Sequence, residues 1–365
     1  MQVPLVDLHA EYALLRDEVL SAIDGVFTGM HLYLGPETEA LEAEWAAYCG
    51  VDHAVAVATG TDAILLGLLA GGVRPGDEVI SVGWTFIATL EAIVHAGAIP
   101  VVVDVDPDTL TLDPSLLAAA ITPRTRAILP VHIYGHPAAM APIMDLAAEH
   151  DLFVLEDGAQ AHGATYHGRM SGSLGHAGAF SFYVTKNLSA YGEGGMVTTD
   201  DPALVEQLLM LRNHGRSGTG HAIVGYNGRV QEVQAAVVRV KLKRFAQWQA
   251  RRRAIAARYN EALAGLPLRV PFEAEGCGHA YHLYMVRPDD RERLKAGLEE
   301  AGVSYAIHYP LPANRQPAMA PWGLNDVVLP VSDRLADEVL ALPIHPMLKD
   351  DQIGHVIDTV LRTLS

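Results

Sequence analysis

Short apolar runs alternate with amphipathic segments between residues 50 and 200. The apolar runs are "HAVAVAT", "DEVISVG", "IPVVVDV", "TRAILPV", "DLFVLED" and "GAFSFY". Runs of this length predict strands, and their alternation with helical segments predicts βαβ units. Such units form a mostly parallel sheet that is buried between helices on both faces. The connecting segments "GGVRPGD" and "DVDPDT" consist of turn-forming residues, which agrees with this interpretation.

Helical patterns flank the region of predicted strands. Two precede it, "EYALLRDEVLSAIDGVF" and "ETEALEAEWAAYCG", and "PAAMAPIMDLAAEH" within it predicts a helix that begins at proline. A long helical pattern covers residues 231–264, followed by strand-like "AYHLYMV", helix-like "DRERLKAGLEEAG" and a terminal helix from "KDDQI". We therefore predict an α/β protein with a large domain over residues 1–250 and a smaller α+β domain over residues 251–365.

The composition restricts the classes of function. Half of the 365 residues are hydrophobic and 19% are charged, which is typical of a globular protein. The net charge of −17 argues against a nucleic-acid partner. The first residues lack the basic and apolar regions of a signal peptide, and no apolar stretch reaches the ~20 residues that span a membrane. Cys49 and Cys277 match no metal or redox spacing, so we expect a cytoplasmic protein without disulfides.

Polar residues at the carboxyl ends of the predicted strands are candidates for chemistry, because ligands bind there in parallel sheets. Gly60 and Thr61 lie where a strand ends and a helix begins, so they could bind a phosphate or simply cap the helix. Asp157 could keep a ring nitrogen protonated, or it could only accept bonds from turn amides. Phe86 could cover a planar cofactor or be a core aromatic residue.

Lys186 is the first lysine of the chain, and it lies between strand-like "AFSFY" and glycine-rich "YGEGG". An amine at that position would reach the crevice at the edge of the sheet. Lysine forms a Schiff base with a carbonyl group, and burial lowers the pKa of lysine enough to leave the amine nucleophilic. A phosphate site, an acid for a ring nitrogen, an aromatic cover and a lysine are together what pyridoxal 5'-phosphate requires.

The chain also resembles the DegT-type sugar aminotransferases, which have the fold type I architecture of pyridoxal phosphate enzymes. The resemblance extends over nearly the whole chain, in the motifs "VPLVDLHAEY", "YLGPETEALEAEWAAYCG", "ATGTDAI", "TFIAT", "LPVHIYGHPAAM", "EDGAQAHGA", "FSFYVTKNLSAYGEGG", "RNHG", "GYNGRVQEVQAA" and "HYPLP". It implies transfer of an amino group from glutamate or glutamine to a keto sugar. The chain looks most like the members that aminate nucleotide-linked (dTDP or UDP) 3-keto sugars. A 4-keto nucleotide sugar and a keto-cyclitol such as scyllo-inosose are the alternatives.

The resemblance assigns roles to individual residues. Lys186 would be the Schiff-base lysine and proton shuttle, Asp157 the partner of the pyridine nitrogen, and Phe86 the stacking residue. Gln160 would lie near the phenolic oxygen of the cofactor ring. The phosphate would be bound by Gly60, Thr61, Ser181 and, from the neighbouring subunit, Asn227. The resemblance therefore implies a homodimer with shared active sites.

The expected substrate contacts are Arg229, His308, Tyr309 and Asn314. Arg229 would lie near the subunit interface, where a surface salt bridge is the alternative. Relatives commonly read "HYPxPxHxQPA" where this chain has "HYPLPANRQPA", so Asn314 replaces a histidine and Arg315 follows it. We expect this loop to lie in the small domain and to border the substrate entrance, unless the position is only surface-exposed.

Three rival interpretations are weaker. A dehydratase of the same fold would have histidine in place of Lys186. A regulatory protein of the same fold would not need the lysine, the aspartate and the phosphate site together. A metal site would need paired ligand spacing, which is absent among His132, His136, His162 and His167. We therefore expect an enzyme without a metal.

Overall fold

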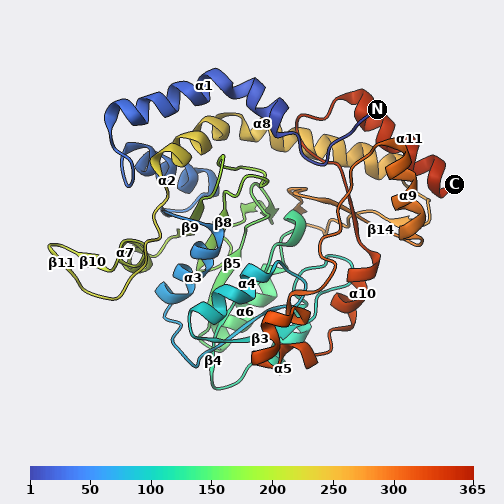
Figure 1. Cartoon of the computed structure of the whole chain (residues 1–365). Helices are drawn as coiled ribbons and strands as arrows, with labels where there is room; N and C mark the ends of the chain where they lie inside the picture. The colour runs from blue at the N-terminus through green and yellow to red at the C-terminus, as the bar shows by residue number, and fades with distance from the viewer.

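A seven-stranded sheet lies at the centre of the molecule (Figure 1), and the computed structural model describes residues 1–365. The strand order is β1-β9-β8-β5-β4-β2-β3. The strands are β1 His53–Val57, β2 Glu78–Val82, β3 Ile99–Val103, β4 Thr125–Ile128, β5 Phe153–Asp157, β8 Ala177–Ser181 and β9 Gly195–Thr199. Strand β9 runs antiparallel to β1 and β8, and the other neighbours pair in parallel. The mostly parallel sheet agrees with the alternating pattern of the sequence, although the pattern did not single out β9.

Helices cover both faces of this sheet (Figure 1). They are α3 Gly60–Ala70, α4 Ile87–His95, α5 Leu117–Ala120, α6 Met140–Glu149, α7 Pro202–Leu211 and α10 Pro330–Glu338. Helices α3, α4 and α7 share one apolar core with the sheet, and α5, α6 and α10 share another. Every residue of β2, β8 and β9 is buried, as expected for strands with helices on both sides. Helix α6 begins at Met140 after its cap Ala139, and not at Pro137 as predicted.

Three further helices lie on one side of the sheet. They are α1 Leu8–Gly29, α2 Pro36–Cys49 and the 31-residue α8 Glu232–Ala262, and Figure 1 shows α1 lying along α8. The carboxylate of Glu232 is buried and accepts hydrogen bonds from the backbone N–H groups of Gly35 and Thr38 at 2.8 and 3.0 Å. It therefore satisfies amides that the start of α2 leaves unpaired.

The end of the chain forms a second, smaller core. A three-stranded sheet of β12 Leu268–Arg269, β14 Tyr284–Pro288 and β15 Leu340–Leu342 packs with α9 Arg291–Ala301 and α11 Asp350–Leu364. The predicted boundary at residue 250 falls inside the continuous helix α8. The segment around the 3-10 helices η3 Ala313–Arg315, η4 Pro317–Trp322 and η5 Leu324–Asp326 packs on the core of the large sheet. Part of the predicted small domain thus joins the large one.

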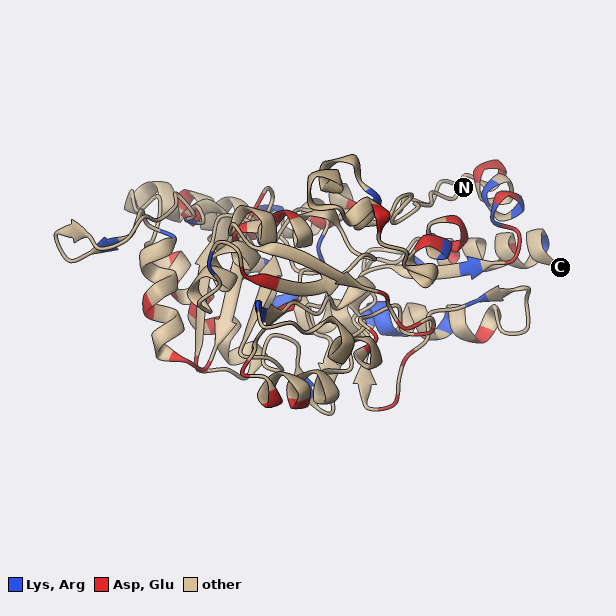
Figure 2. Cartoon of the chain, turned by 90° about the horizontal axis from the view of Figure 1, so that it is seen from below, with Lys and Arg blue, Asp and Glu red and all other residues tan.

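The remaining strands are short. Strands β6 Thr165–Tyr166, β7 Arg169–Met170 and β13 Cys277–Gly278 form one small sheet, and β10 Arg216–Ser217 pairs with β11 Gly220–His221. The β10–β11 hairpin projects from the body at the left of Figure 1. Figure 2 marks the positions of the charged residues on the ribbon, and they lie mainly on helices and loops. None of the helices combines the length and the apolar composition needed to cross a membrane.

Candidate active site

A cavity of about 600 Å³ lies at the carboxyl ends of the parallel strands, between the large sheet and the C-terminal part. Nine of the residues predicted from the sequence line it: Gly60, Thr61, Phe86, Asp157, Gln160, Ser181, Lys186, His308 and Tyr309. A volume of several hundred Å³ is typical of a pocket for a small molecule or cofactor. The structure therefore brings together residues that are up to 249 positions apart in the sequence.

One end of the cavity is suited to bind a phosphate. Helix α3 begins there at Gly60, and the Thr59 hydroxyl caps it by accepting a hydrogen bond from Asp62 N at 2.9 Å. A Cβ atom at Gly60 would lie 2.5 Å from the Cβ of Ser181, so this close approach requires glycine. The hydroxyls of Thr61 and Ser181 face the same space as the positive end of the helix dipole. This end of the cavity thus offers hydroxyl donors and a helix start to an anion.

Asp157 is the last residue of β5 and is 4% exposed. One of its carboxylate oxygens accepts a hydrogen bond from the Thr89 hydroxyl at 2.8 Å, and the other accepts one from Ala159 N at 3.1 Å. Burial raises the pKa of Asp157, and these two hydrogen bonds and the positive charge of Lys186 oppose that rise. The carboxylate is thus fixed in place at the floor of the cavity.

Lys186 is half-buried in the loop that follows β8. Burial lowers the pKa of its amine from 10.5 to about 8, against the attraction of Asp157 and Glu193, which acts in the opposite direction. A much larger fraction of this amine is therefore neutral near physiological pH than is usual for lysine. A neutral amine can attack a carbonyl carbon or accept a proton.

The far wall of the cavity is aromatic and polar. Gln160 donates a hydrogen bond from Nε2 to the Tyr309 hydroxyl at 2.9 Å. The ring centroids of Tyr309 and Phe86 lie 6.1 Å apart, with an angle of 33° between the ring planes. The side chain of Phe86 is 56% exposed, so the alternative of a core aromatic residue does not hold. An exposed aromatic face at this position could cover a planar ring.

Several residues that line the cavity were not predicted from the sequence, among them Thr89, Glu193 and His282. Thr89 and Glu193 lie within the quoted motifs "TFIAT" and "YGEGG", but the motifs alone do not show what they contact. His282 lies in "AYHLYMV", which predicts only a strand. The strand begins at Tyr284, so His282 precedes it, and its Nδ1 lies 3.2 Å from Oδ1 of Asn187, the neighbour of Lys186.

Asn227 and Arg229 lie outside the cavity of their own chain. Asn227 is exposed, and its side-chain oxygen accepts a hydrogen bond from Arg229 Nε at 3.1 Å. The Arg229 guanidinium also lies 4.6 Å from the centre of the Tyr33 ring, so it pairs with an amide and an aromatic ring rather than with a carboxylate. The loop is bonded to its own chain, since Tyr226 N donates to Leu211 O at 2.7 Å.

The predicted substrate contact at Asn314 does not hold. Its side chain is fully buried against the large sheet, and its amide nitrogen lies 3.4 and 3.3 Å from the carbonyl oxygens of Leu324 and Val327. Neighbouring residues of the segment, Ala313, Met319 and Leu324, belong to the core of the large sheet, and this packing could not be read from the local sequence. Arg315 forms a salt bridge with Asp333 instead of facing the cavity. Asn314 is a structural residue of this segment.

The histidines that were weighed as metal ligands have separate surroundings. His132 lies 2.8 Å from a Glu156 oxygen through Nε2, and its Nδ1 accepts a hydrogen bond from Ala138 N at 3.0 Å. His162 is buried among aromatic rings, and burial lowers its pKa to about 3. His132 therefore carries its proton on Nε2, and His162 is neutral at physiological pH.

A sequence model of the DegT/DnrJ/EryC1/StrS aminotransferase family matches residues 14–361. The chain belongs to this family. It is 47% identical to the dTDP-3-amino-3,4,6-trideoxy-alpha-D-glucose transaminase of Streptomyces venezuelae over 361 residues, which cover 98% of this chain and 95% of the relative. It is 42% identical to the pleiotropic regulatory protein of Geobacillus stearothermophilus over 364 residues, 99% of this chain and 98% of the relative.

The fold is likewise that of the family. The crystal structure of S. venezuelae DesV superposes with a TM-score of 0.96 at 47% sequence identity, and the match covers 99% of this chain and 98% of that one. The predicted family, the fold type I architecture and the enzyme class are thereby confirmed. Aminotransferases of this family use pyridoxal 5'-phosphate, so the predicted cofactor is confirmed as well.

Proposed function

We propose that this aminotransferase moves an amino group from glutamate or glutamine to a nucleotide-linked 3-keto sugar during the synthesis of an amino sugar. The observation that carries the proposal is the amine of Lys186, which faces the cavity together with the Asp157 carboxylate. The name of the S. venezuelae relative, which describes a dTDP-linked 3-amino sugar, supports the choice of acceptor.

The residues of the cavity fit the cofactor. Lys186 would hold it covalently, Asp157 would face the ring nitrogen, and Phe86 would cover the ring. Gln160 would lie beside the phenolic oxygen. The phosphate would occupy the space at the start of α3, where Gly60 lies against Ser181 with no room for a Cβ. When bound, pyridoxal phosphate supplies an electron sink for the α-carbon of the amino donor and carries the amino group.

The two ionisable groups have complementary tasks in this proposal. Lys186 would take the proton from the α-carbon of the donor and deliver it to the aldehyde-derived carbon of the cofactor, which receives the amino group. An amine with a pKa of about 8 suits both transfers. Asp157 would keep its negative charge toward the ring nitrogen, because Thr89 and Ala159 already donate hydrogen bonds to its two oxygens. His308 and Tyr309 would border the substrates.

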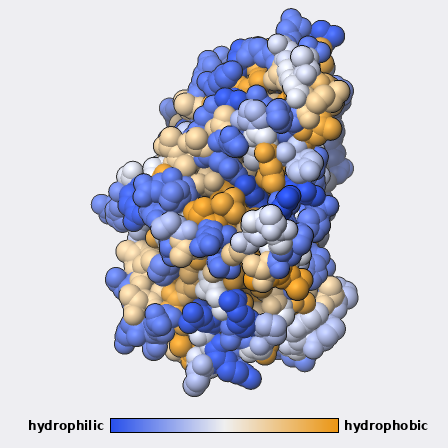
Figure 3. Space-filling view, turned by 90° about the vertical axis from the view of Figure 1, so that its left-hand side faces the viewer, coloured by the Kyte–Doolittle hydropathy of each residue, from blue (hydrophilic) through white to orange (hydrophobic).

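The active unit would be a symmetric homodimer with shared sites. Figure 3 shows apolar patches on the face that carries the β10–β11 hairpin. Large apolar or aromatic side chains are exposed at the end of α1, in the segment before α2 and just after the hairpin: Phe27, Met30, Leu32, Tyr33, Val224 and Tyr226. A second copy would cover them. Asn227 would then reach the phosphate site of the partner, and Arg229 would meet the pyrophosphate of the sugar nucleotide.

We place this activity in the cytoplasm, without a nucleic-acid or membrane partner. Cys49 and Cys277 are unpaired, which suits a reducing compartment. The net charge of −17 opposes binding to a polyanion, although a single arginine can still contact a pyrophosphate locally.

The test is a turnover assay of the purified protein with glutamate or glutamine and with each acceptor in turn. We expect mass spectrometry to show amination of a dTDP- or UDP-linked 3-keto sugar, and no product with Lys186→Ala. Amination of scyllo-inosose alone would contradict the nucleotide-sugar acceptor. Failure of both donors to convert the cofactor to its amino form would favour a regulatory role instead.

A further inference from the structure

Tyr134 lies behind the wall of the active-site cavity, in the 3-10 helix η2 (Ile133–Gly135) that follows β4. It is 3% exposed, and its φ of 57° places it in the left-handed region, which a bulky side chain rarely adopts. Such a conformation persists when several surrounding contacts determine it. The backbone N–H, the carbonyl and the hydroxyl of Tyr134 are all hydrogen-bonded.

The backbone N–H of Tyr134 donates a hydrogen bond to Oε1 of Gln160 at 2.7 Å. This bond identifies Oε1 as the acceptor end of the Gln160 amide and leaves Nε2 as the donor end. The donor end faces the cavity and binds the Tyr309 hydroxyl at 2.9 Å. Tyr134 thus determines which end of the Gln160 amide the cavity presents.

Two other polar groups of Tyr134 bind the C-terminal part of the chain. Its carbonyl oxygen accepts hydrogen bonds from the N–H groups of His282 and Leu283 at 2.9 and 3.3 Å. Its hydroxyl donates a hydrogen bond to the carbonyl oxygen of His308. His282, Leu283 and His308 all line the cavity. One buried residue therefore connects three separate segments of the cavity wall.

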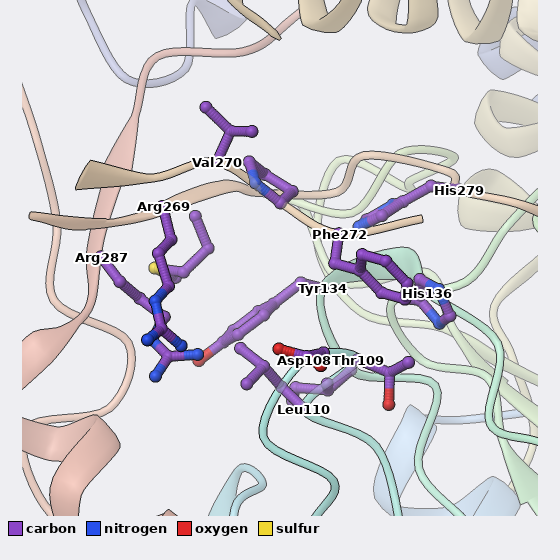
Figure 4. A pocket seen from close by; sticks show the side chains of 13 residues that line it. Asp108, Thr109, Leu110, Tyr134, His136, Arg269, Val270, Phe272, His279 and Arg287 are labelled. Carbon is purple, nitrogen blue, oxygen red and sulfur yellow. The ribbon is translucent and has the colours of Figure 1, made fainter. Parts of the chain in front are cut away.

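The ring of Tyr134 also borders a second cavity. Figure 4 shows the ring between Arg269 and Arg287 on one side and Phe272 and His136 on the other. This cavity has a volume of about 50 Å³, which leaves room for a few water molecules and is too small for a sugar or an amino acid. Tyr134 therefore acts through the residues that it holds, not through a ligand on this side.

We propose that Tyr134 is a positioning residue for the transamination proposed above, on which this inference rests. It holds the amide of Gln160 and the segment of His308 and Tyr309 around the space where the cofactor ring would lie. Loss of its hydroxyl would free the carbonyl of His308 and loosen the Tyr309 ring, while Lys186 and Asp157 would keep their own contacts.

Tyr134→Phe is the test variant, and Tyr259→Phe is its matched control. Tyr259 is also buried, and its hydroxyl donates to a backbone carbonyl, Pro343 O, at 3.0 Å in the C-terminal core. Each change removes one hydroxyl bond to a carbonyl, so we expect similar losses of thermal stability. Only Tyr134→Phe should alter the visible circular dichroism of the bound cofactor and slow the half-reaction with the amino donor, by about fivefold.

Hydrogen exchange separates this inference from the proposed function. In the full chain freed of cofactor, Tyr134→Phe should speed amide exchange in residues 305–312, whereas Tyr259→Phe should not. Equal exchange in the two variants, or an unchanged circular dichroism band with Tyr134→Phe, would overturn the positioning role. Absence of any half-reaction in the wild type would reject the transamination, and the exchange data would still decide whether Tyr134 holds the segment.

Discussion

Lys186 shows how strongly the chemistry of one residue depends on its surroundings. Burial lowers the pKa of its amine to about 8, while Asp157 and Glu193 oppose that shift. Between about pH 8 and 10.5, the unfolded chain would hold a proton that the folded chain has lost. The contribution of Lys186 to the free energy of unfolding therefore rises with pH across this window.

This shift predicts the reactivity of Lys186 in the protein freed of cofactor. Its rate of modification by an amine-specific reagent should rise with a midpoint near pH 8, because only the neutral amine reacts. Mass spectrometry of the peptide that contains Lys186 at a series of pH values measures the midpoint. A midpoint at pH 10 or above would show that burial does not govern this amine.

Residues at strand ends were the part of the site that the sequence could reveal. Lys186, Asp157 and Phe86 each follow a predicted strand, so the rule for parallel sheets brings them to one edge. The hydrogen bond between Thr89 and Asp157 joins residues 68 positions apart, and no local pattern encodes such a contact. Asn314 illustrates the same limit, because its burial depends on how η3–η5 pack on the large sheet.

At the scale of elements, two ion pairs join α1 to α8 in different surroundings. Lys241 is fully buried, lies 2.7 Å from a Glu11 oxygen and donates to the Ser189 hydroxyl at 3.0 Å. Arg244 and Glu18 form a more exposed pair at 2.7 Å, in which 31% and 44% of the two side chains are accessible to water. Burial lowers the pKa of Lys241, and Glu11 opposes that shift. The two pairs thus have the same partner helices and different solvation.

Lys241→Met should destabilise the protein far more than Arg244→Met. Removing one partner of a buried pair leaves the other charge poorly solvated, so we expect a loss of about 3 kcal/mol in the free energy of unfolding. The exposed pair should contribute less than about 1 kcal/mol. Urea unfolding at neutral pH measures both values, and equal losses would contradict the difference in solvation.

The sequence predicted the limits of a long helix more accurately than those of a short strand. The long periodic pattern of α8 gave its limits within two residues, since it was expected over 231–264 and covers Glu232–Ala262. The strand expected in "AYHLYMV" begins only at Tyr284, because the preceding residues bind the carbonyl of Tyr134 instead of a neighbouring strand. A local apolar run does not show whether its backbone will pair with a neighbouring strand or bind a loop carbonyl such as that of Tyr134.

At the scale of the whole molecule, the proposed shared site predicts that two inactive variants can complement each other. Lys186→Ala and Asn227→Ala would each inactivate a homodimer. In a mixed dimer, one site would carry both lesions and the other neither. Equal mixing after reversible dissociation should therefore restore about a quarter of the wild-type activity. No recovery from confirmed mixed dimers would reject the shared site.

The covalent hold of Lys186 on the cofactor is tested most directly by borohydride reduction of the purified protein, followed by trypsin digestion and mass spectrometry. Trypsin does not cut at a modified lysine, so the account predicts that the cofactor mass appears on a peptide of residues 170–212, uncut at Lys186. Lys186→Ala should carry no such label. Cofactor attached to another lysine, or none attached in protein that retains the visible absorption of bound cofactor, would contradict the account.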